Sequence, residues 1–419
     1  MRLIDKIKKM GSLLILSTCC LTSCNFLDVV PPEQAGLGDA VKKPESTLGF
    51  LYSCYAGIKG SSNPITYTGM EAASTDEFVF PELWGHSGQR AGWGLLTPES
   101  PGDWKWGNIY RYIGQCYLFL SQLPNALDVS EVQKREWTAE ANFLIAYYHF
   151  LILEYYGPCP ITDSYIDMDT PNNEYHGRYH FDYVTSWISM KLDEAAKDLP
   201  ASRIGSEWGR ATSTIAKAVK AQLLLLAASP LFNGNSDYIN VKDNQGRHLF
   251  PTQVDNSKWK LAADAALEAI NCAKENGHEK LYTFSLPINS ISAATRKLLD
   301  IGEAVTEKWN EEIIWGSTRN VNGLQTVAMA KHTKGSHYNA RSVLGPTLSV
   351  AEAFYSSNGV PISEDNSDFW TANYPNRYEI TTIPDEGNNK YYLQIGEQTA
   401  YLHLNREPRF YASLSFDRG

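Results

Sequence analysis

Residues 131–158 read EVQKREWTAEANFLIAYYHFLILEYYGP, and this stretch decides the fold class. Its apolar side chains recur at helical spacing, at Trp137, Ala141, Leu144, Tyr148, Leu151 and Tyr155. Ser130 and Gln133 predict a capping box at the start, and Gly157-Pro158 predicts the end. Because Ile145 and Ile152 widen the apolar stripe, we expect a helix over 131–156 that is buried on more than one side.

The same periodicity predicts further helices on both sides of this stretch. They cover Ser213–Ser229, Lys258–Asn276, Thr47–Ile58, Trp106–Leu120, Tyr179–Ala196 and Thr347–Tyr355. Strand patterns are few, at Ile313–Trp315, Tyr391–Ile395 and Tyr401–Leu404. No clean 34-residue period is present. The succession of amphipathic helices predicts a mainly α fold, with a tetratricopeptide-like scaffold of helical hairpins, an irregular loop-rich subdomain and a few short strands. Because the period is missing, the repeats are expected to be degenerate.

The composition limits the function classes. The chain has 419 residues, 43% of them hydrophobic and 20% charged, which is enough apolar material for a packed core. Its formal net charge of −10 disfavours nucleic acid as a partner, because nucleic acid binding needs a basic surface. Aromatic residues make up 12% of the chain and supply flat faces for ligands as well as core volume.

The N-terminus has the pattern of an export signal. Four basic residues (Arg2, Lys6, Lys8 and Lys9) precede a short apolar stretch that ends in Leu21-Thr22-Ser23-Cys24. This ending is similar to a bacterial lipobox, so we expect residues 1–23 to be a lipoprotein signal peptide and Cys24 to be the lipidated first residue. The alternative is an ordinary signal peptide cut near Cys24. Residues 24–45, rich in Pro and Gly, are expected to form a tether.

Four further cysteines, Cys54, Cys116, Cys159 and Cys272, lie far apart without Cys-x-x-Cys spacing, so we expect no zinc site. Cys54, Cys116 and Cys272 fall in predicted helices, where small buried thiols are the common case, although an exported protein could also form disulfides. The sequence predicts neither a metal site nor a cofactor.

Several segments together resemble the SusD/RagB family of outer-membrane nutrient-binding lipoproteins. The matching segments, in order, are Cys24-Asn25-Phe26-Leu27-Asp28, Trp106-x-x-x-Tyr110-x-x-Ile113, Ala139–Phe150 followed by Tyr156-Gly157-x-x-Pro160, Gly209-Arg210-Ala211-Thr212, Asn310–Trp315, Phe354–Ile362 and Arg406-Glu-Pro-Arg-Phe-Tyr-Ala412. The resemblance implies a helical scaffold over residues 46–310 and a loop-rich region over 311–419. Because family members usually continue well past the Arg406–Ala412 motif, we expect the C-terminal region to be truncated.

The resemblance also implies a function. Members of the family lie at the cell surface, capture oligosaccharides or in some cases peptides, and deliver them to a TonB-dependent outer-membrane transporter. We therefore expect a lipid-anchored, non-enzymatic glycan-binding protein on the outer membrane, with this transporter and an oligosaccharide as its partners. The alternatives are binding of a peptide or other nutrient in the same role, a scaffold that binds only protein, or a surface glycoside hydrolase that uses Asp76 and Glu77.

A Trp-rich window supplies the candidate binding residues. Trp84, Trp93 and Trp104 lie among glycines and prolines, and a rigid ring on a loop can stack on the apolar face of a sugar. The side chains of Asp76, Arg90 and Asn108 could bind sugar hydroxyls. A polar loop further along adds Asn320 and Tyr338. The structural alternatives are that the rings pack a core and that the later loop is merely solvated.

Overall fold

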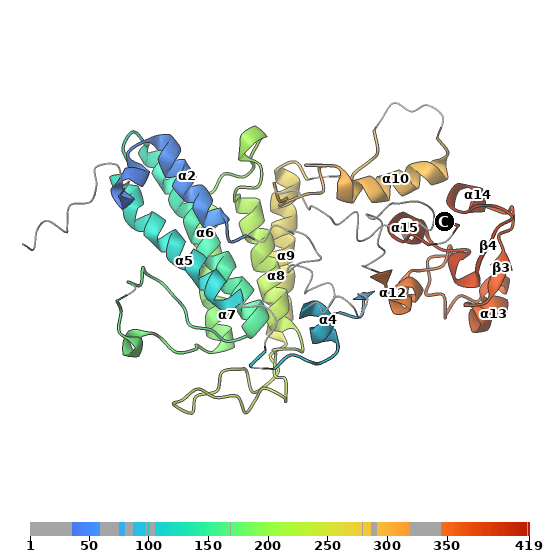
Figure 1. Cartoon of the computed structure of the whole chain (residues 1–419), viewed down its shortest axis with the longest axis horizontal. Helices are drawn as coiled ribbons and strands as arrows, with labels where there is room; N and C mark the ends of the chain where they lie inside the picture. The colour runs from blue at the N-terminus through green and yellow to red at the C-terminus, as the bar shows by residue number, and fades with distance from the viewer. Residues whose placement is uncertain are drawn as a thin grey trace, which may run out of the picture.

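A computed structural model gives the structure of the chain and describes residues 36–58, 75–79, 87–97, 99–100, 105–167, 169–278, 280–285, 291–318, 345–416 and 418–419. The chain forms two regions, and helix α10 (Ala293–Thr306) lies between them (Figure 1). The first is an array of helices, and the second is a small C-terminal subdomain over residues 345–419. The mainly α fold predicted from the sequence is confirmed.

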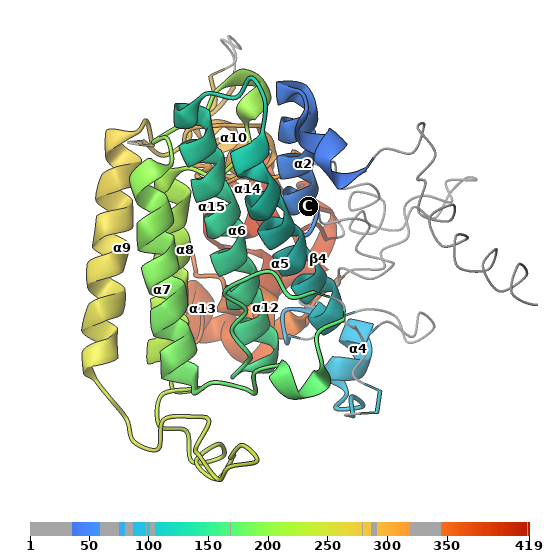
Figure 2. The ribbon, with the colours of Figure 1, turned by 90° about the vertical axis from the view of Figure 1, so that its left-hand side faces the viewer.

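Six helices form the array, and they lie roughly side by side (Figure 2). They are α2 (Pro44–Tyr55), α5 (Lys105–Gln122), α6 (Glu131–Tyr156), α7 (Phe181–Asp198), α8 (Ser213–Ala228) and α9 (Ser257–Glu275). Consecutive helices from α5 to α9 contact each other, as expected for stacked hairpins. Each predicted helix is present, with ends within about three residues of the prediction, a shift typical of sequence-based boundaries. For α2 the shift has a clear cause, because Pro44 suits the first helical position.

The helix α6 is the centre of the array. Its predicted capping box is confirmed, since the Ser130 hydroxyl accepts from the Gln133 N–H and the Gln133 side chain accepts from the Ser130 N–H. Gly157 ends the helix with a φ of +65°, in the left-handed region that favours glycine. Because α6 contacts α2, α5, α7 and α8, most of its length is buried, as the wide apolar stripe predicts. Cys54, Cys116, Cys159 and Cys272 are free buried thiols.

The C-terminal subdomain has its own small core, centred on Ala351, Ile362, Trp370, Leu402 and Phe410. Its elements are α12 (Leu348–Ala353), α13 (Asp368–Asn373), α14 (Asn389–Tyr392) and α15 (Pro408–Ser413), with β3 (Ile380–Thr382) paired antiparallel to β4 (Gln398–Ala400). Helix α10 (Ala293–Thr306), which the periodicity missed, contacts α14 and α15. The short helix α4 (Ser87–Gly92) precedes α5 in the chain.

A second connection ties the loop before α5 to the subdomain. The strand β1 (Phe78–Val79) pairs antiparallel with β2 (Gly345–Pro346). The Thr347 hydroxyl also donates to the Asp76 carbonyl oxygen at 2.5 Å, and the Thr347 N–H donates to the Glu77 carbonyl oxygen at 3.0 Å. The segment that contains Asp76 and Glu77 therefore lies beside the start of α12.

No helix in the described part of the chain is long and apolar enough to cross a membrane.

The three predicted strands are wrong. Ile313–Trp315 follows a turn in which the Asn310 side chain accepts from the Glu312 N–H, and its apolar side chains pack on the helices instead of pairing. Tyr391–Ile395 overlaps α14, and Tyr401–Leu404 is mostly a 3-10 turn over Tyr401–His403 directly after β4. Short apolar runs satisfy strand and helix patterns equally, so tertiary packing decides between them.

Arg406 holds the subdomain together. Its guanidinium donates to the carbonyl oxygens of Leu402 at 2.8 Å and of Ala351 and Phe354 at 2.6 Å each, and it lies 4.4 Å from the Phe410 ring centroid. The residue is 2% exposed, and burial lowers the pKa of Arg406 to about 10. A charged donor buried against several carbonyl groups fixes the chain ends that it joins.

We therefore predict that Arg406→Met destabilises the subdomain by about 3–5 kcal/mol, because it leaves buried carbonyl groups without a donor. Thermal unfolding and limited proteolysis would measure this loss. Arg409→Met is the matched control in the same motif, since the Arg409 side chain is 59% exposed and forms a surface ion pair with Glu407, so we expect a loss below about 1 kcal/mol. Equal effects of the two substitutions would contradict the role of Arg406.

A buried histidine predicts a pH dependence of stability. Both ring nitrogens of His149 are engaged, Nδ1 with the Ile145 carbonyl oxygen at 2.7 Å and Nε2 as acceptor from the Thr162 N–H at 3.1 Å. Burial lowers the pKa of His149 to about 4 from the ordinary value of 6.5. Because the unfolded chain then binds the proton more readily, stability is full above pH 6.5 and falls as the pH drops toward 4, by up to about 3 kcal/mol.

The measurement is the free energy of unfolding by denaturant between pH 4 and pH 7. His149→Gln cannot take up this proton, so its curve should be flatter than that of the parent even if it is less stable at pH 7. His176→Gln, at an exposed position, should follow the parent curve. Parallel curves for the parent and His149→Gln would rule out the buried neutral histidine.

Candidate functional site

A cleft of about 550 Å³ opens beside the middle of α6. Aromatic side chains form its walls: Tyr52 and Tyr55 from α2, Tyr147 from α6, Trp208 from the loop between α7 and α8, and Trp315. Small polar residues, Ser206, Ser317 and Thr318, complete the lining. The site thus combines flat apolar rings with a few hydroxyl groups, which is the composition of small-ligand sites in general.

Trp315 joins two distant segments at this cleft. Its ring packs edge-on against Phe143 at 5.5 Å and Tyr147 at 5.0 Å between centroids, and its indole N–H donates to the Gly209 carbonyl oxygen at 3.0 Å. Gly209 has a φ of +87°, and a Cβ there would lie 3.1 Å from Thr318 Cγ2, so both backbone conformation and space favour glycine. The chain after α10 is therefore held against the loop before α8.

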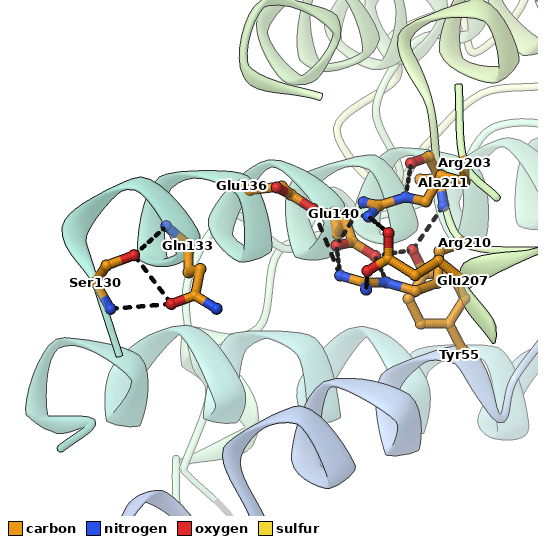
Figure 3. A network of polar contacts seen from close by, with 9 residues as sticks. All are labelled: Tyr55, Ser130, Gln133, Glu136, Glu140, Arg203, Glu207, Arg210 and Ala211. Atoms are coloured by element: carbon orange, nitrogen blue, oxygen red, sulfur yellow. Dashed lines mark hydrogen bonds and ion pairs between the residues drawn. The ribbon is translucent and has the colours of Figure 1, made fainter. Parts of the chain in front are cut away.

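A buried ionic network lies under the cleft (Figure 3). Glu140 of α6 is fully buried, and its Oε1 accepts from Arg203 at 2.9 Å and from Arg210 at 2.5 Å. Its Oε2 accepts from Arg210 Nε at 3.1 Å and from the Tyr55 hydroxyl at 2.5 Å. The Tyr55 oxygen in turn accepts from the Ala211 N–H at 2.9 Å. One carboxylate thus fixes α2, α6 and the loop between α7 and α8 relative to each other.

Two outer carboxylates extend the network, which then contains three carboxylates and two guanidinium groups. Glu136 accepts from Arg203 at 2.7 Å, and Glu207 pairs with both Arg203 and Arg210. Burial, together with the charge of Glu140, raises the pKa of Tyr55 well above its ordinary value, so its hydroxyl remains a donor. Because these groups are occupied with one another, Arg210 and Tyr55 line the cleft without offering a free charge.

Tyr147 and Trp208 carry polar groups at the walls of the cleft. Within the described part of the chain, no hydrogen bond occupies the Tyr147 hydroxyl or the Trp208 indole N–H. Burial, with a smaller contribution from the charge of Glu154, raises the pKa of Tyr147 to about 12, so its hydroxyl is protonated at neutral pH. Tyr147 and Trp208 therefore each combine a ring with a donor that no described residue occupies, a pairing that suits ligands with both apolar faces and polar groups.

The residues predicted from the Trp-rich window lie elsewhere where the structure describes them. Trp93 is 53% exposed in the turn after α4, and Asn108 is exposed on α5. The Arg90 guanidinium binds its own loop, donating to the Leu95 carbonyl oxygen at 3.3 Å and the Ser100 hydroxyl at 3.0 Å. The Asp76 side chain is exposed before β1. None of these four lines the cleft, and Trp84, Trp104, Asn320, Tyr338 and Cys24 lie outside the described residues.

Sequence reasoning missed the walls of the cleft. Tyr52 and Tyr147 fall in predicted helices, where aromatic residues are usually assigned to the core. Trp208 had a local signal, because a single Trp between Gly205 and Gly209 indicates a ring on a constrained loop. The packing of α2 against α6 brings Tyr52 and Tyr147 together, and the docking of the loop before α8 adds Trp208.

The sequence and the fold of this chain are similar to those of known proteins. A SusD-like family model, described as "Starch-binding associating with outer membrane", matches residues 62–224. The solved structure of BT4246 is 38% identical, with a TM-score of 0.75 over 88% of this chain and 64% of that chain. A SusD-like protein (BF3747) from Bacteroides fragilis is 18% identical, with a TM-score of 0.61 over 90% of this chain and 62% of that chain.

The chain belongs to the SusD/RagB family. A further solved SusD-like protein from Bacteroides fragilis, described as carbohydrate binding (BF0978), shares the fold at 18% identity, with a TM-score of 0.57 over 88% of this chain and 59% of that chain. The chain spans less than two thirds of the length of each of these three solved chains. Comparison with curated protein sequences finds no match. Two of the segments that carry the family resemblance, Ala139–Phe150 and Gly209–Thr212, meet in the Glu140 network.

We predict that Glu140→Ala destabilises the protein by about 3–5 kcal/mol, because two buried guanidinium groups lose their shared carboxylate. Denaturant unfolding would measure the loss. Glu194→Ala on α7 is the matched control, since the Glu194 side chain is 51% exposed and forms a surface pair with Lys191, so its effect should stay below about 1 kcal/mol. A small effect of Glu140→Ala would show that the network does not hold the helices.

Proposed function

We propose that the protein captures oligosaccharides at the cell surface and delivers them to a TonB-dependent outer-membrane transporter. The observation that carries the proposal is the cleft, in which the rings of Tyr52, Tyr147 and Trp208 face a common space of about 550 Å³. A pyranose presents C–H groups on its faces and hydroxyl groups at its rim. Stacked rings bind the faces, and donors at the ring edges bind the rim.

Family membership supports the glycan as the ligand class. The matching family model is described as starch-binding, and one solved relative of the same fold is described as carbohydrate binding. The cleft also suits binding better than hydrolysis. Glycoside hydrolysis needs two carboxyl groups about 5–10 Å apart across the bond, whereas Glu140 is consumed by two arginines and Asp76 and Glu77 are adjacent on an exposed segment.

The anchor and the transporter belong to the same proposal. We propose that Cys24 carries the lipid after removal of residues 1–23, which keeps the protein on the outer membrane. A tethered binder beside a transporter raises the concentration of ligand at the pore, so moderate affinity is sufficient for capture and release. The mechanism requires no covalent chemistry by this chain.

We predict that the protein binds a neutral oligosaccharide from a glycan panel and that Tyr52→Ala weakens this binding about tenfold, the loss expected for one stacking ring. Isothermal titration would give Kd for the parent and the variant. Tyr183→Ala is the matched control, because Tyr183 is an exposed tyrosine on α7 that does not line the cleft.

The same titrations separate the alternatives. Trp84→Ala and Trp93→Ala test the Trp-rich window, and if they lose affinity while Tyr52→Ala keeps it, the site lies in that window. If the protein binds peptides but no glycan, the ligand is a peptide and the proposed ligand class is wrong. Release of reducing sugar that is lost in Glu77→Gln would make the protein a hydrolase. A folded protein that binds no glycan would refute the proposal.

A further inference from the structure

Two tryptophans stack at the edge of the cleft. The rings of Trp208 and Trp309 lie 4.8 Å apart between centroids at an interplanar angle of 25°. Trp208 lines the cleft and also a second cavity of about 370 Å³ behind it, whereas Trp309 lines only the second cavity. One face of Trp208 is therefore covered by Trp309, and the same residue contributes to the lining of the cleft.

The backbone of Trp309 is in an unfavourable conformation. Its φ is +58°, in the left-handed region, which bulky residues rarely adopt because Cβ crowds the following carbonyl. Such a conformation persists only where the surrounding structure imposes it, and it recurs at ligand sites. Glycine would adopt it without this cost, so the ring at position 309 is retained against a local preference.

Contacts on both sides impose this conformation. The Asn310 side chain donates to the carbonyl oxygens of Ala304 at 2.9 Å and Glu307 at 3.0 Å, which fixes the turn after α10. A Cβ on Gly316 would lie 2.7 Å from the six-membered ring of Trp309, so only glycine leaves room for the indole. Trp309 is thus clamped between Trp208 and the backbone of Gly316.

We propose that Trp208 is the ring on which the ligand stacks and that Trp309 is a positioning residue that holds it. The ligand class is a saccharide ring with a continuous C–H face, and the inference rests on the proposed function. A ring backed by a second ring cannot rotate away, so it presents a fixed plane that loses little entropy when a sugar is bound. Tyr52 and Tyr147 line the same cleft and complete the site.

The decisive variants change the support and leave the stacking ring in place. Trp309→Gly removes the support and also relieves the left-handed conformation, so we expect a Kd about tenfold weaker for the glycan that the parent binds, with little change in Tm. Trp309→Phe keeps an aromatic support and should bind within about threefold of the parent. Trp208→Ala should lose affinity at least as strongly as Trp309→Gly.

Two further measurements test the stack without deleting the Trp309 ring and without a ligand, respectively. Gly316→Ala displaces the Trp309 ring without deleting it and should weaken binding several-fold. Far-ultraviolet circular dichroism should show an exciton couplet from the stacked indoles in the parent that Trp208→Ala and Trp309→Gly lack. An absent signal in the parent would contradict the stack itself.

The outcomes distinguish this inference from the proposed function. If Trp309→Gly and Gly316→Ala bind like the parent while Trp208→Ala loses affinity, Trp309 is only structural and its positioning role is overturned. If Trp208→Ala binds like the parent while Tyr52→Ala loses affinity, the glycan site stands but the stacking ring is misassigned. If the parent binds no glycan, the proposed function fails first.

Discussion

The carboxylate of Glu140 is the constraint on which the helical array depends. It lies fully buried on α6 and receives hydrogen bonds from Arg203, Arg210 and Tyr55. These partners come from the loop between α7 and α8 and from α2, so a single charged group joins three parts of the chain that apolar packing alone would let slide. A buried ion pair of this kind adds little net stability over apolar residues, but it defines one arrangement, since any other leaves a charge without a partner.

This constraint also shapes the cleft. Arg210 and Tyr55 bind Glu140 from the cleft side, so the floor of the site is rigid and its charges are already paired. The walls then differ from the floor in chemistry, because Tyr147 and Trp208 carry aromatic rings and donor groups that no described residue occupies. Arg406 has a comparable role in the C-terminal subdomain, where one guanidinium joins the ends of α12 and of the turn before α15 through carbonyl groups. In both regions a motif arginine is used for assembly.

The sequence predicts the array well because helices are encoded locally. Apolar spacing, the Ser130–Gln133 box and Gly157 specify α6 without reference to the rest of the chain. Strands β1 and β2 cannot be predicted in this way, because two residues near position 78 pair with two near position 345 and neither segment has a pattern of its own. Helix α10 was not predicted although its apolar side chains recur at helical spacing, and none of its residues is buried in the structure.

The candidate site shows the same division between local and long-range information. Aromatic richness and glycine spacing direct attention to loops, and they single out Trp93, whose ring is indeed exposed. The cleft, however, is built from residues of α2, α6, the loop before α8 and the segment after α10, which no local pattern connects. Beside Trp208 lies the left-handed φ of Trp309, a backbone conformation that no composition or periodicity reports. An unfavourable torsion retained beside an aromatic cleft is therefore more specific evidence of a ligand site than the number of tryptophans nearby.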